Sequence, residues 1–346
     1  MNPQITTGAL LSPHDYRDAL VASAVAAAQI TLPPTLNTQL GPVLMQGHIP
    51  ACVSHSMVDI LKLYWFIKTG VWIDFSPRFL DILSAESDIP LDGGRRPRTV
   101  LKVMYNIGCC TTATLPNDVT LSLAEYRDPS VITQAMKDEA AKYKIPGFIN
   151  SPLGFQEMRQ YVYYYGALST LFSVGEQMYR PSWNPVDTDP LRIPNPVTSG
   201  HQMTVKGWDS PTFNLLRNEW SEAWANKGET HYDPGAWSPY IHEAWAIADI
   251  PKHLAEFLHS LPKSSDFHYN WKKDMVFGMQ NEDIKFAQIA LMILGFLTNV
   301  SADELGIFGP KTAKAVRLYQ ISKGIHPFPN SIGPRTRDAL NHQFSI

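Results

Sequence analysis

Residues 46–69 read QGHIPACVSHSMVDILKLYWFIKT, and this stretch decides the fold prediction for the first part of the chain. From Cys52 onward, apolar residues recur every three or four positions, which is the spacing of one buried face of an α-helix. These residues are Val53, Met57, Ile60, Leu61, Tyr64 and Trp65. The pattern predicts a buried helix that begins at or near Cys52 and ends near Thr69.

The position of Cys52 at the start of this helix has a chemical consequence. Backbone N–H groups at a helix N-terminus carry partial positive charge, which stabilises a thiolate and lowers the thiol pKa from about 8.5. A buried cysteine can also be no more than a small core residue. The choice between these interpretations depends on other residues of the chain.

The composition limits the class of protein. The 346 residues correspond to about two domains. The hydrophobic share of 44% and the charged share of 18% exclude a wholly disordered chain. A net charge of −3 gives no basis for phosphate-driven binding of nucleic acid. The nearest candidate for a membrane span, Ala287 to Val300, is shorter than the ~20 residues that a spanning helix needs, so we expect none.

The cysteines and the N-terminal residues bear on the compartment. The three cysteines are Cys52, Cys109 and Cys110, which allow at most one ordinary disulfide and exclude a stapled secreted scaffold. The Ala-rich residues 19–30 imitate a signal-peptide core, but acidic Asp15 and Asp18 precede them where cations are needed. We therefore expect a short helix rather than an export signal, and synthesis in the cytoplasm.

The order of the predicted elements indicates an α+β domain followed by a small all-α domain. A second helix is predicted at 100–107, and short apolar runs between turn residues predict strands at 161–171, 203–208 and 213–216. A polar stretch at 261–267 reads as a linker, so we place the domains at 1–262 and 263–346. Apolar periodicity in the second domain predicts three helices, at 284–296, 312–322 and 336–344.

Three polar residues can complete a catalytic site with Cys52. Gln46 lies six positions before Cys52, and its side-chain amide can donate to an oxyanion. His201 begins a strand-like run, and Asn218 follows another apolar run. A cysteine, a histidine and an asparagine are the residue types of a nucleophile, its base and a group that orients the base.

These residues, in this order, resemble the papain-like cysteine peptidases. The spacing from Cys52 to His201 lies within the ~130–150 positions of that family, and the resemblance covers about residues 10–250. It implies a two-lobed fold with a helical left lobe and a β-rich right lobe. Trp220 and Trp224 stand where the family has two tryptophans after the asparagine. The resemblance also implies a substrate-binding role for Gly93, Gly94, Gly200 and Trp220.

The chain departs from the family pattern at informative positions. Ile49 stands where a disulfide-forming cysteine is usual, and Val53 stands where an aromatic residue is usual. Glu219 replaces the serine after the asparagine, and Ser221 replaces a glycine. These differences are typical of a divergent bacterial or phage branch without that disulfide. About 40 residues precede Gln46, so we do not expect the long inhibitory propeptide of lysosomal relatives.

The resemblance implies a specific mechanism. Cys52 and His201 would form a thiolate–imidazolium pair, Asn218 would orient the imidazole, and Trp220 would shield that bond from water. Gln46 and the backbone N–H of Cys52 would hold the oxyanion. A metal site at Cys52 with His48 and His55 lacks further ligands at a recognisable spacing. We therefore predict no metal and no cofactor.

Residues 304–320, ELGIFGPKTAKAVRLYQ, decide the interpretation of the second domain. Gly306 and Gly309 form a tight loop around Phe308, and Thr312 is expected to cap the helix that follows. A shorter echo, SIGPRTRDAL, occupies 331–340. Over about 275–342 the pattern resembles the three-helix peptidoglycan-binding domain. Leu305 replaces the usual acidic residue, which leaves a helical interaction module without a sugar–peptide ligand as the alternative.

These patterns lead to one functional hypothesis and two alternatives. The first is a cysteine endopeptidase that acts on a peptide or protein and is targeted to peptidoglycan, or to another cell-surface ligand, through 275–342. Without an export signal, we expect such an enzyme to reach the cell wall by virion-associated or lysis-dependent release, or by a secretion route that needs no N-terminal signal. The second is a non-catalytic structural or virion-associated binding protein on a peptidase fold. The third, an acyl-transfer enzyme, is disfavoured by the early Gln46 and the late Asn218.

Overall fold

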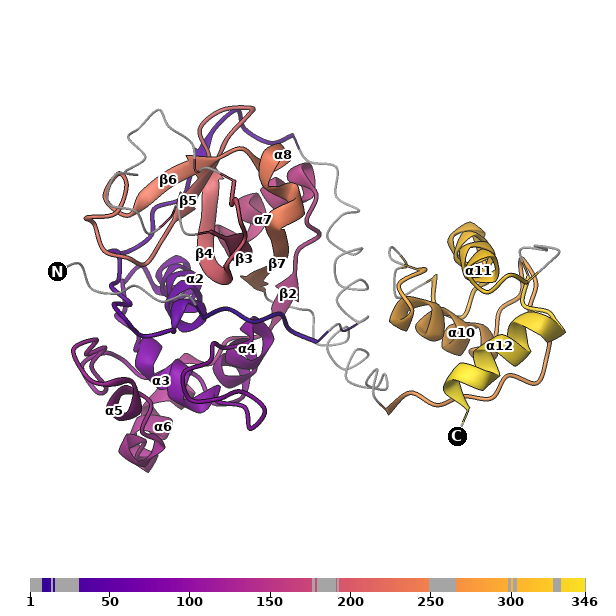
Figure 1. The fold of residues 1–346 in the computed structure, drawn as a ribbon, viewed down its shortest axis with the longest axis horizontal. Helices are drawn as coiled ribbons and strands as arrows, with labels where there is room; N and C mark the ends of the chain where they lie inside the picture. Colours follow the sequence, from indigo (N-terminus) through magenta and orange to yellow (C-terminus); the bar gives the residue numbers. More distant parts are fainter. Residues whose placement is uncertain are drawn as a thin grey trace. The chain divides into compact units, whose positions relative to one another are not determined.

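The computed structural model describes residues 8–13, 15, 31–175, 178, 191, 193–248, 266–297, 300, 304–325 and 331–345. These residues form two compact units (Figure 1). The first contains the described residues of 8–12 and 31–248, and the second contains 13, 15 and those of 266–345. The predicted boundary at 262 and the predicted helix at 19–30 lie outside the described residues.

Helix α2, Cys52–Thr69, is the central element of the first unit and has the predicted bounds. Its first 12 residues are all buried, including the charged Asp59 and Lys62. The helix ends at Gly70, whose left-handed φ of 74° lets its N–H bond the carbonyl of Phe66. One side of α2 packs against helices and another side packs against strands, so α2 joins the two lobes (Figure 1).

Short helices form the helical lobe around α2. Their starts are capped locally: Ser76 accepts from the N–H of Phe79, and Ser122 forms a capping box with Glu125. The predicted second helix is confirmed as α4. The α-helices are α3 Pro77–Leu83, α4 Pro97–Asn106, α5 Leu123–Tyr126 and α6 Gln134–Ala140, with 3-10 turns η1 Pro129–Val131 and η2 Ala141–Tyr143.

A seven-stranded antiparallel sheet forms the second lobe, with the order β2-β7-β3-β4-β5-β6 and β1 paired to β4. The strands are β1 Leu36–Asn37, β2 Phe148–Asn150, β3 Leu168–Val174, β4 Ser199–Trp208, β5 Asn214–Arg217, β6 Glu229–Tyr232 and β7 Ile241–Ile247. The short helical pieces α8 Pro234–Trp237 and η4 Ser238–Tyr240 precede β7. The strands predicted at 203–208 and 213–216 correspond to β4 and β5. The α+β, two-lobed fold class is confirmed.

The strand predicted at 161–171 is wrong over its first half. Residues up to Tyr165 belong to helix α7, Phe155–Tyr165, because Met158, Tyr161 and Val162 bury one helical face. Gly166, with a φ of 86°, ends the helix, and β3 begins two residues later. The aromatic run at 161–165 resembled a strand because the residues that complete the buried face of the helix lie before the run in the chain.

The described residues of the second unit form three helices: α10 Glu282–Ile293, α11 Pro310–Ser322 and α12 Pro334–Phe344. They bury a separate core that includes Trp271, Phe308 and Tyr319. The three predicted helices are therefore confirmed. None of the helices in the described part of the chain is long and apolar enough to cross a membrane.

The predicted cap at Thr312 is wrong, and its actual role is a buried contact that occurs twice. Thr312 lies in the first turn of α11, and its hydroxyl accepts from Nε2 of Gln288 at 2.8 Å. Thr336, in the first turn of α12, accepts from Nε2 of Gln320 at 2.9 Å. The residue at the N-cap is a glycine in both helices. The sequence echo at 331–340 is therefore a structural repeat of one glutamine–threonine contact.

Candidate functional site

Cys52 is the first residue of α2 and its thiol is buried. The backbone N–H of Gly8 donates to its sulfur at 3.3 Å, and the backbone N–H of Gln202 is a second donor. Burial raises the pKa of the Cys52 thiol to about 11, against a smaller lowering by these N–H donors. The helix start is thus present as predicted, but desolvation outweighs it.

His201 and Asn218 are brought together by the pairing of β4 with β5. His201 lies in β4, and Asn218 directly follows β5. Nε2 of His201 and Oδ1 of Asn218 are 2.8 Å apart. Since an amide oxygen only accepts, Nε2 of His201 carries the proton. The ring of Trp220 lies 4.9 Å from the His201 ring at an angle of 39°, so it covers this hydrogen bond.

The other ring nitrogen of His201 is buried and has no hydrogen-bond partner among the described residues. Burial lowers the pKa of His201 to about 4, although the bond to Asn218 opposes this. The structure therefore holds Cys52 as a thiol and His201 as a neutral imidazole. This differs from the expected thiolate–imidazolium pair because both groups are desolvated.

Gln46 lies on the loop that leads into α2. Its backbone N–H donates to the carbonyl of Glu219 at 2.9 Å, and its side-chain Nε2 donates to the carbonyl of Ile49 at 3.0 Å. The contact with Glu219 joins the Gln46 loop to the segment that carries Asn218.

A short N-terminal stretch pairs through backbone hydrogen bonds with Arg95 and Gly200. The N–H of Ala9 donates to the carbonyl of Gly200 at 3.2 Å, and Ala9 pairs with Arg95 as in a parallel sheet. The N–H of Arg95 donates to the carbonyl of Gly8 at 2.8 Å, and the N–H of Leu10 donates to the carbonyl of Arg95 at 3.0 Å. We call residues 8–10 the N-terminal strap.

Two of the predicted cleft glycines leave room for the strap. A Cβ atom at Gly94 would lie 1.9 Å from the carbonyl oxygen of Gly8, and one at Gly200 would lie 2.6 Å from that of Ala9. A side chain at either position would exclude the strap backbone. Gly93 has another contact, since its carbonyl accepts from Arg127 at 2.7 Å.

Sequence analysis did not identify the strap. Its residues, Gly-Ala-Leu, show no periodic pattern and contain no reactive group. Its binding depends on backbone hydrogen bonds to Arg95 and Gly200, which lie far away in the sequence. Backbone pairing of this kind leaves no residue-type signal, so no sequence pattern was available to predict it.

A buried carboxyl pair lies behind Asn218. Glu219 is buried beside Asp59, and its carboxyl accepts from the N–H of Leu44 at 2.5 Å. Burial, followed by the Asp59 charge, raises the pKa of Glu219 well above its ordinary 4.5, and Arg217 opposes the rise. A carboxyl with a raised pKa therefore lies where the resemblance implied a serine.

His55 has structural partners rather than metal-ligand geometry. Its Nδ1 donates to the carbonyl of Ala51 at 2.8 Å, and its Nε2 accepts from the amide of Asn117 at 3.1 Å. Burial lowers the pKa of His55 to about 4, which keeps the ring neutral. Among the residues that the structure describes, no three His, Cys, Asp or Glu side chains are arranged to hold a metal ion.

Solved structures with the same arrangement of helices and strands are cysteine proteases. Xylellain, a cysteine protease from Xylella fastidiosa, matches with a TM-score of 0.60 and 19% identity over 72% of this chain and 98% of that chain. The first unit has the papain-like cysteine protease fold. The Amb a 11 cysteine protease of ragweed pollen, in its proform, matches this papain-like unit with a TM-score of 0.50 and 19% identity, over 66% of this chain and 69% of that chain.

The second unit matches a family by sequence. A family described as "Putative peptidoglycan binding domain" matches residues 280–327, within the range of 275–342 inferred from the sequence pattern. The chain thus combines a papain-like unit with a peptidoglycan-binding domain. No curated protein matches the sequence as a whole or in part.

Proposed function

We propose that the papain-like unit is a cysteine endopeptidase that hydrolyses peptide bonds through Cys52, His201 and Asn218. The observation that carries the proposal is the 2.8 Å hydrogen bond from His201 to Asn218, together with the backbone N–H of Gln202, the residue after His201, which donates to the Cys52 thiol at the start of α2. This bond leaves Nδ1 of His201 as the basic ring nitrogen. Nδ1 is buried and has no hydrogen-bond partner among the described residues, and the backbone N–H of the next residue, Gln202, contacts the thiol. Nδ1 is therefore available as the base.

The reaction follows from these groups. Nδ1 of His201 takes the proton of Cys52, and the sulfur attacks the carbonyl carbon of the peptide bond. The side-chain amide of Gln46 and the backbone N–H of Cys52 stabilise the oxyanion that forms. His201 then gives its proton to the leaving amine as the C–N bond breaks, and water hydrolyses the thioester.

The strap determines when this chemistry can start. Its backbone uses Arg95 and Gly200, which a bound substrate would need, and it covers the sulfur of Cys52. Its departure would open the cleft and bring water to Cys52 and His201. Solvation then favours the charged forms of both groups, so the ion pair expected from the sequence belongs to the open enzyme.

We propose that the C-terminal unit targets the peptidase to peptidoglycan or to another cell-surface ligand. The family match at 280–327 supports this assignment. A binding unit on the same chain raises the concentration of the peptidase near the peptides of that surface without changing its chemistry. A peptide or protein close to the cell wall is thus the proposed substrate.

Turnover of an unstructured protein tests the peptidase assignment. Purified wild-type protein and Cys52→Ala are incubated with fluorescently labelled casein, and an epoxide thiol inhibitor is used to map the reactive cysteine. We expect turnover by the wild type alone and modification at Cys52. Equal turnover by Cys52→Ala would show that another group or a contaminant performs the hydrolysis.

A non-catalytic binding protein on the peptidase fold is the second candidate. The observations in its favour are the raised pKa of Cys52 and the filled cleft. This candidate predicts that the wild type and Cys52→Ala are equally inactive even after the strap is displaced. Activity that appears when the strap is displaced distinguishes a closed peptidase from a binding protein.

A further inference from the structure

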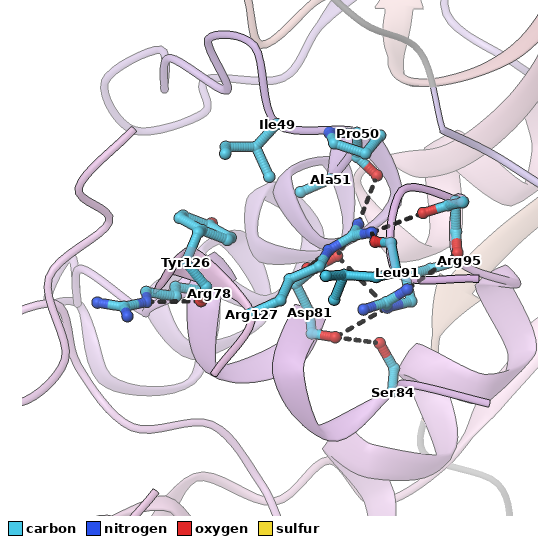
Figure 2. Close-up of polar contacts among 12 residues, drawn as sticks. Ile49, Pro50, Ala51, Arg78, Asp81, Ser84, Leu91, Arg95, Tyr126 and Arg127 are labelled. Carbon is cyan, nitrogen blue, oxygen red and sulfur yellow. Dashed lines mark hydrogen bonds and ion pairs between the residues drawn. The ribbon is translucent and has the colours of Figure 1, made fainter. Parts of the chain in front are cut away.

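Arg127, the residue that directly follows α5, is a buried arginine with several hydrogen-bond partners (Figure 2). Its guanidinium donates to both carboxylate oxygens of Asp81, at 2.7 and 3.2 Å. It also donates to the backbone carbonyls of Pro50 at 3.0 Å, Gly93 at 2.7 Å, and Leu91. One side chain thus joins three segments that are far apart in the sequence.

Two of these segments form the proposed active site. Pro50 lies two residues before Cys52, on the loop from which α2 begins. Leu91 and Gly93 lie just before Gly94 and Arg95, whose backbone contacts the strap. The position of the nucleophile relative to the peptide-binding backbone is therefore set through the guanidinium of Arg127.

Asp81 fixes this arrangement from the opposite side. Its carboxylate holds Arg127, and its backbone carbonyl accepts from Nε of Arg95 at 2.8 Å. Arg78 donates to the carbonyls of Glu125 and Tyr126, the two residues before Arg127, at 2.6 and 2.8 Å. Both the side chain of Arg127 and its backbone are therefore anchored on helix α3, which carries Arg78 and Asp81 (Figure 2).

Only arginine can make this set of contacts. The planar guanidinium has five N–H donors in a fixed fork, and all three nitrogens of Arg127 have acceptors. A lysine ammonium is a single point of charge with three donors and cannot reach an anchor and two separate loops together. The contacts also satisfy the charge, since Asp81 is fully buried beside it.

We propose that Arg127 is a positioning residue for the peptidase reaction, which holds the nucleophile loop and the substrate-binding backbone in the correct relative position through Pro50, Leu91 and Gly93. The proposal rests on the proposed function of the unit. Loss of this alignment misplaces the scissile carbonyl relative to the sulfur, and such misplacement lowers kcat more than it lowers binding.

The test compares Arg127→Lys with Arg159→Lys. Arg159 is also buried, and it donates to the side chain of Asn214 and to the carbonyls of Ser210 and Phe213, away from the proposed site. We expect Arg127→Lys to lower kcat by about 10- to 100-fold with a smaller change in KM. We expect both variants to lower the thermal midpoint of unfolding by similar amounts, and Arg159→Lys to leave kcat unchanged. Asp81→Asn, which weakens the ion pairs of Asp81 with Arg127 and with Arg95, serves as a second variant.

Two further measurements separate positioning from general stability. Hydrogen–deuterium exchange reports whether the segments 48–52 and 90–95 loosen together in Arg127→Lys and remain protected in Arg159→Lys. Alkylation of Cys52 by iodoacetamide should be at least as fast in Arg127→Lys as in the wild type, because a small reagent needs no aligned cleft and a looser 90–95 segment holds the strap less tightly. The proposal is overturned if hydrogen exchange in both segments is unchanged in Arg127→Lys. It is also overturned if the kcat of this variant, per labelled Cys52, equals that of the wild type.

The same experiments distinguish this proposal from the proposed function. A wild-type protein that hydrolyses no peptide, before or after displacement of the strap, counts against the peptidase. The exchange measurement then still decides whether Arg127 couples the two segments, because it needs no turnover. Joint loosening supports the coupling, and independent or absent loosening refutes it.

Discussion

Glu219 shows at the scale of a single residue how burial changes chemistry. Its carboxyl lies next to Asn218 in the chain and beside Asp59 in space, and its pKa is raised well above 4.5. In the unfolded chain the same carboxyl ionises near its ordinary pKa. The folded protein therefore binds this proton more tightly than the unfolded chain does, so a rise in pH lowers stability.

We predict that Glu219→Gln makes the protein less sensitive to alkaline pH. A raised pKa contributes stability that is complete below about pH 4.5 and is lost as the pH rises toward the folded pKa, by up to about 1.4 kcal/mol per pH unit. Glutamine is neutral at all pH values and avoids this loss. Urea unfolding at pH 5 and pH 8 measures the effect.

The control for this prediction is Glu222→Gln, which changes an exposed carboxyl three positions later. It should leave the difference in unfolding free energy between the two pH values unchanged. A wild type that is equally stable at pH 5 and pH 8, with a Glu219→Gln variant that behaves identically, would contradict the assigned direction of the Glu219 pKa.

Asn218 offers a second test at this scale. Asn218→Ala removes the acceptor of Nε2 in His201, so the ring loses its fixed orientation. We expect kcat to fall by about 10- to 100-fold, a part of the effect of a positioned acid–base group. The measurement is peptide hydrolysis normalised to labelled Cys52.

Asn214→Ala is the matched control for Asn218. Asn214 is equally buried, and its amide group bonds Arg159 and Tyr232 rather than His201. Both variants should lose stability by about 1–3 kcal/mol, because each leaves a buried polar group unpaired. Only Asn218→Ala should lose kcat. An equal loss of kcat in both variants would reduce the role of Asn218 to folding.

At the scale of elements, the strap and the cleft walls behave like strands of a small sheet. The carbonyls of Arg95 and Gly200 accept hydrogen bonds from strap N–H groups, and the N–H of Arg95 donates to a strap carbonyl. All three strap residues are bound in this way. Backbone hydrogen bonds of this kind are independent of side chains, so a substrate peptide can replace the strap. The strap therefore competes with the substrate for the same backbone groups.

We predict that Gly8→Val opens the cleft. A Cβ atom at Gly8 would lie 2.3 Å from the carbonyl oxygen of Pro50, and backbone at that distance cannot move aside at low cost. The strap should leave, which exposes Cys52 and lowers the pKa of its thiol from about 11. We expect alkylation of Cys52 at pH 7 and peptide hydrolysis to increase by about 10-fold or more, which corresponds to about 1.4 kcal/mol of lost strap binding.

Leu11→Ala controls for changes near the N-terminus, because Leu11 is 57% exposed and lies just beyond the strap. Its rates should equal those of the wild type. Cys109 and Cys110 should remain unmodified in every variant, since burial holds the pKa of Cys110 at about 12 and that of Cys109 well above 9.0. A Gly8→Val protein as slow as the wild type would mean that the strap does not limit access.

At the scale of the whole molecule, the chain consists of two units with separate cores. Every residue of the proposed triad lies in the first unit, and the family match to a peptidoglycan-binding domain lies in the second. A unit with its own buried core can fold by itself. Binding and hydrolysis are therefore expected to be separable.

We predict that the isolated segment 263–346 sediments with purified peptidoglycan, and that the segment 1–262 hydrolyses a small peptide as the full chain does. Circular dichroism confirms that each segment is folded before use. The matched control for binding is the segment 263–346 with Gln288→Ala, which breaks the buried contact to Thr312. If the folded segment 263–346 stays in the supernatant, its ligand is a protein partner rather than peptidoglycan.

Local sequence patterns predicted those helices and strands whose buried face is formed by residues close together in the chain. The apolar positions after Cys52 predicted the bounds of α2, and the Gly-Pro-x-Thr repeats accompanied the starts of α11 and α12. Periodicity carries this information because a helix buries one face at a fixed spacing. The pattern was misleading at 161–165, where the residues that complete the helical face precede the aromatic run.

The sequence by itself determined the α+β order, the helix that begins at Cys52, the three C-terminal helices and the set of candidate residues, because each depends on residue type and short-range spacing. Only the tertiary structure decided that the strap contacts the sulfur of Cys52, that burial favours the neutral forms of Cys52 and His201, and that Arg127 joins Pro50 to Gly93. These features are made of backbone contacts and desolvation between distant segments. Neither leaves a pattern along the chain, since both depend on which residues the fold brings together.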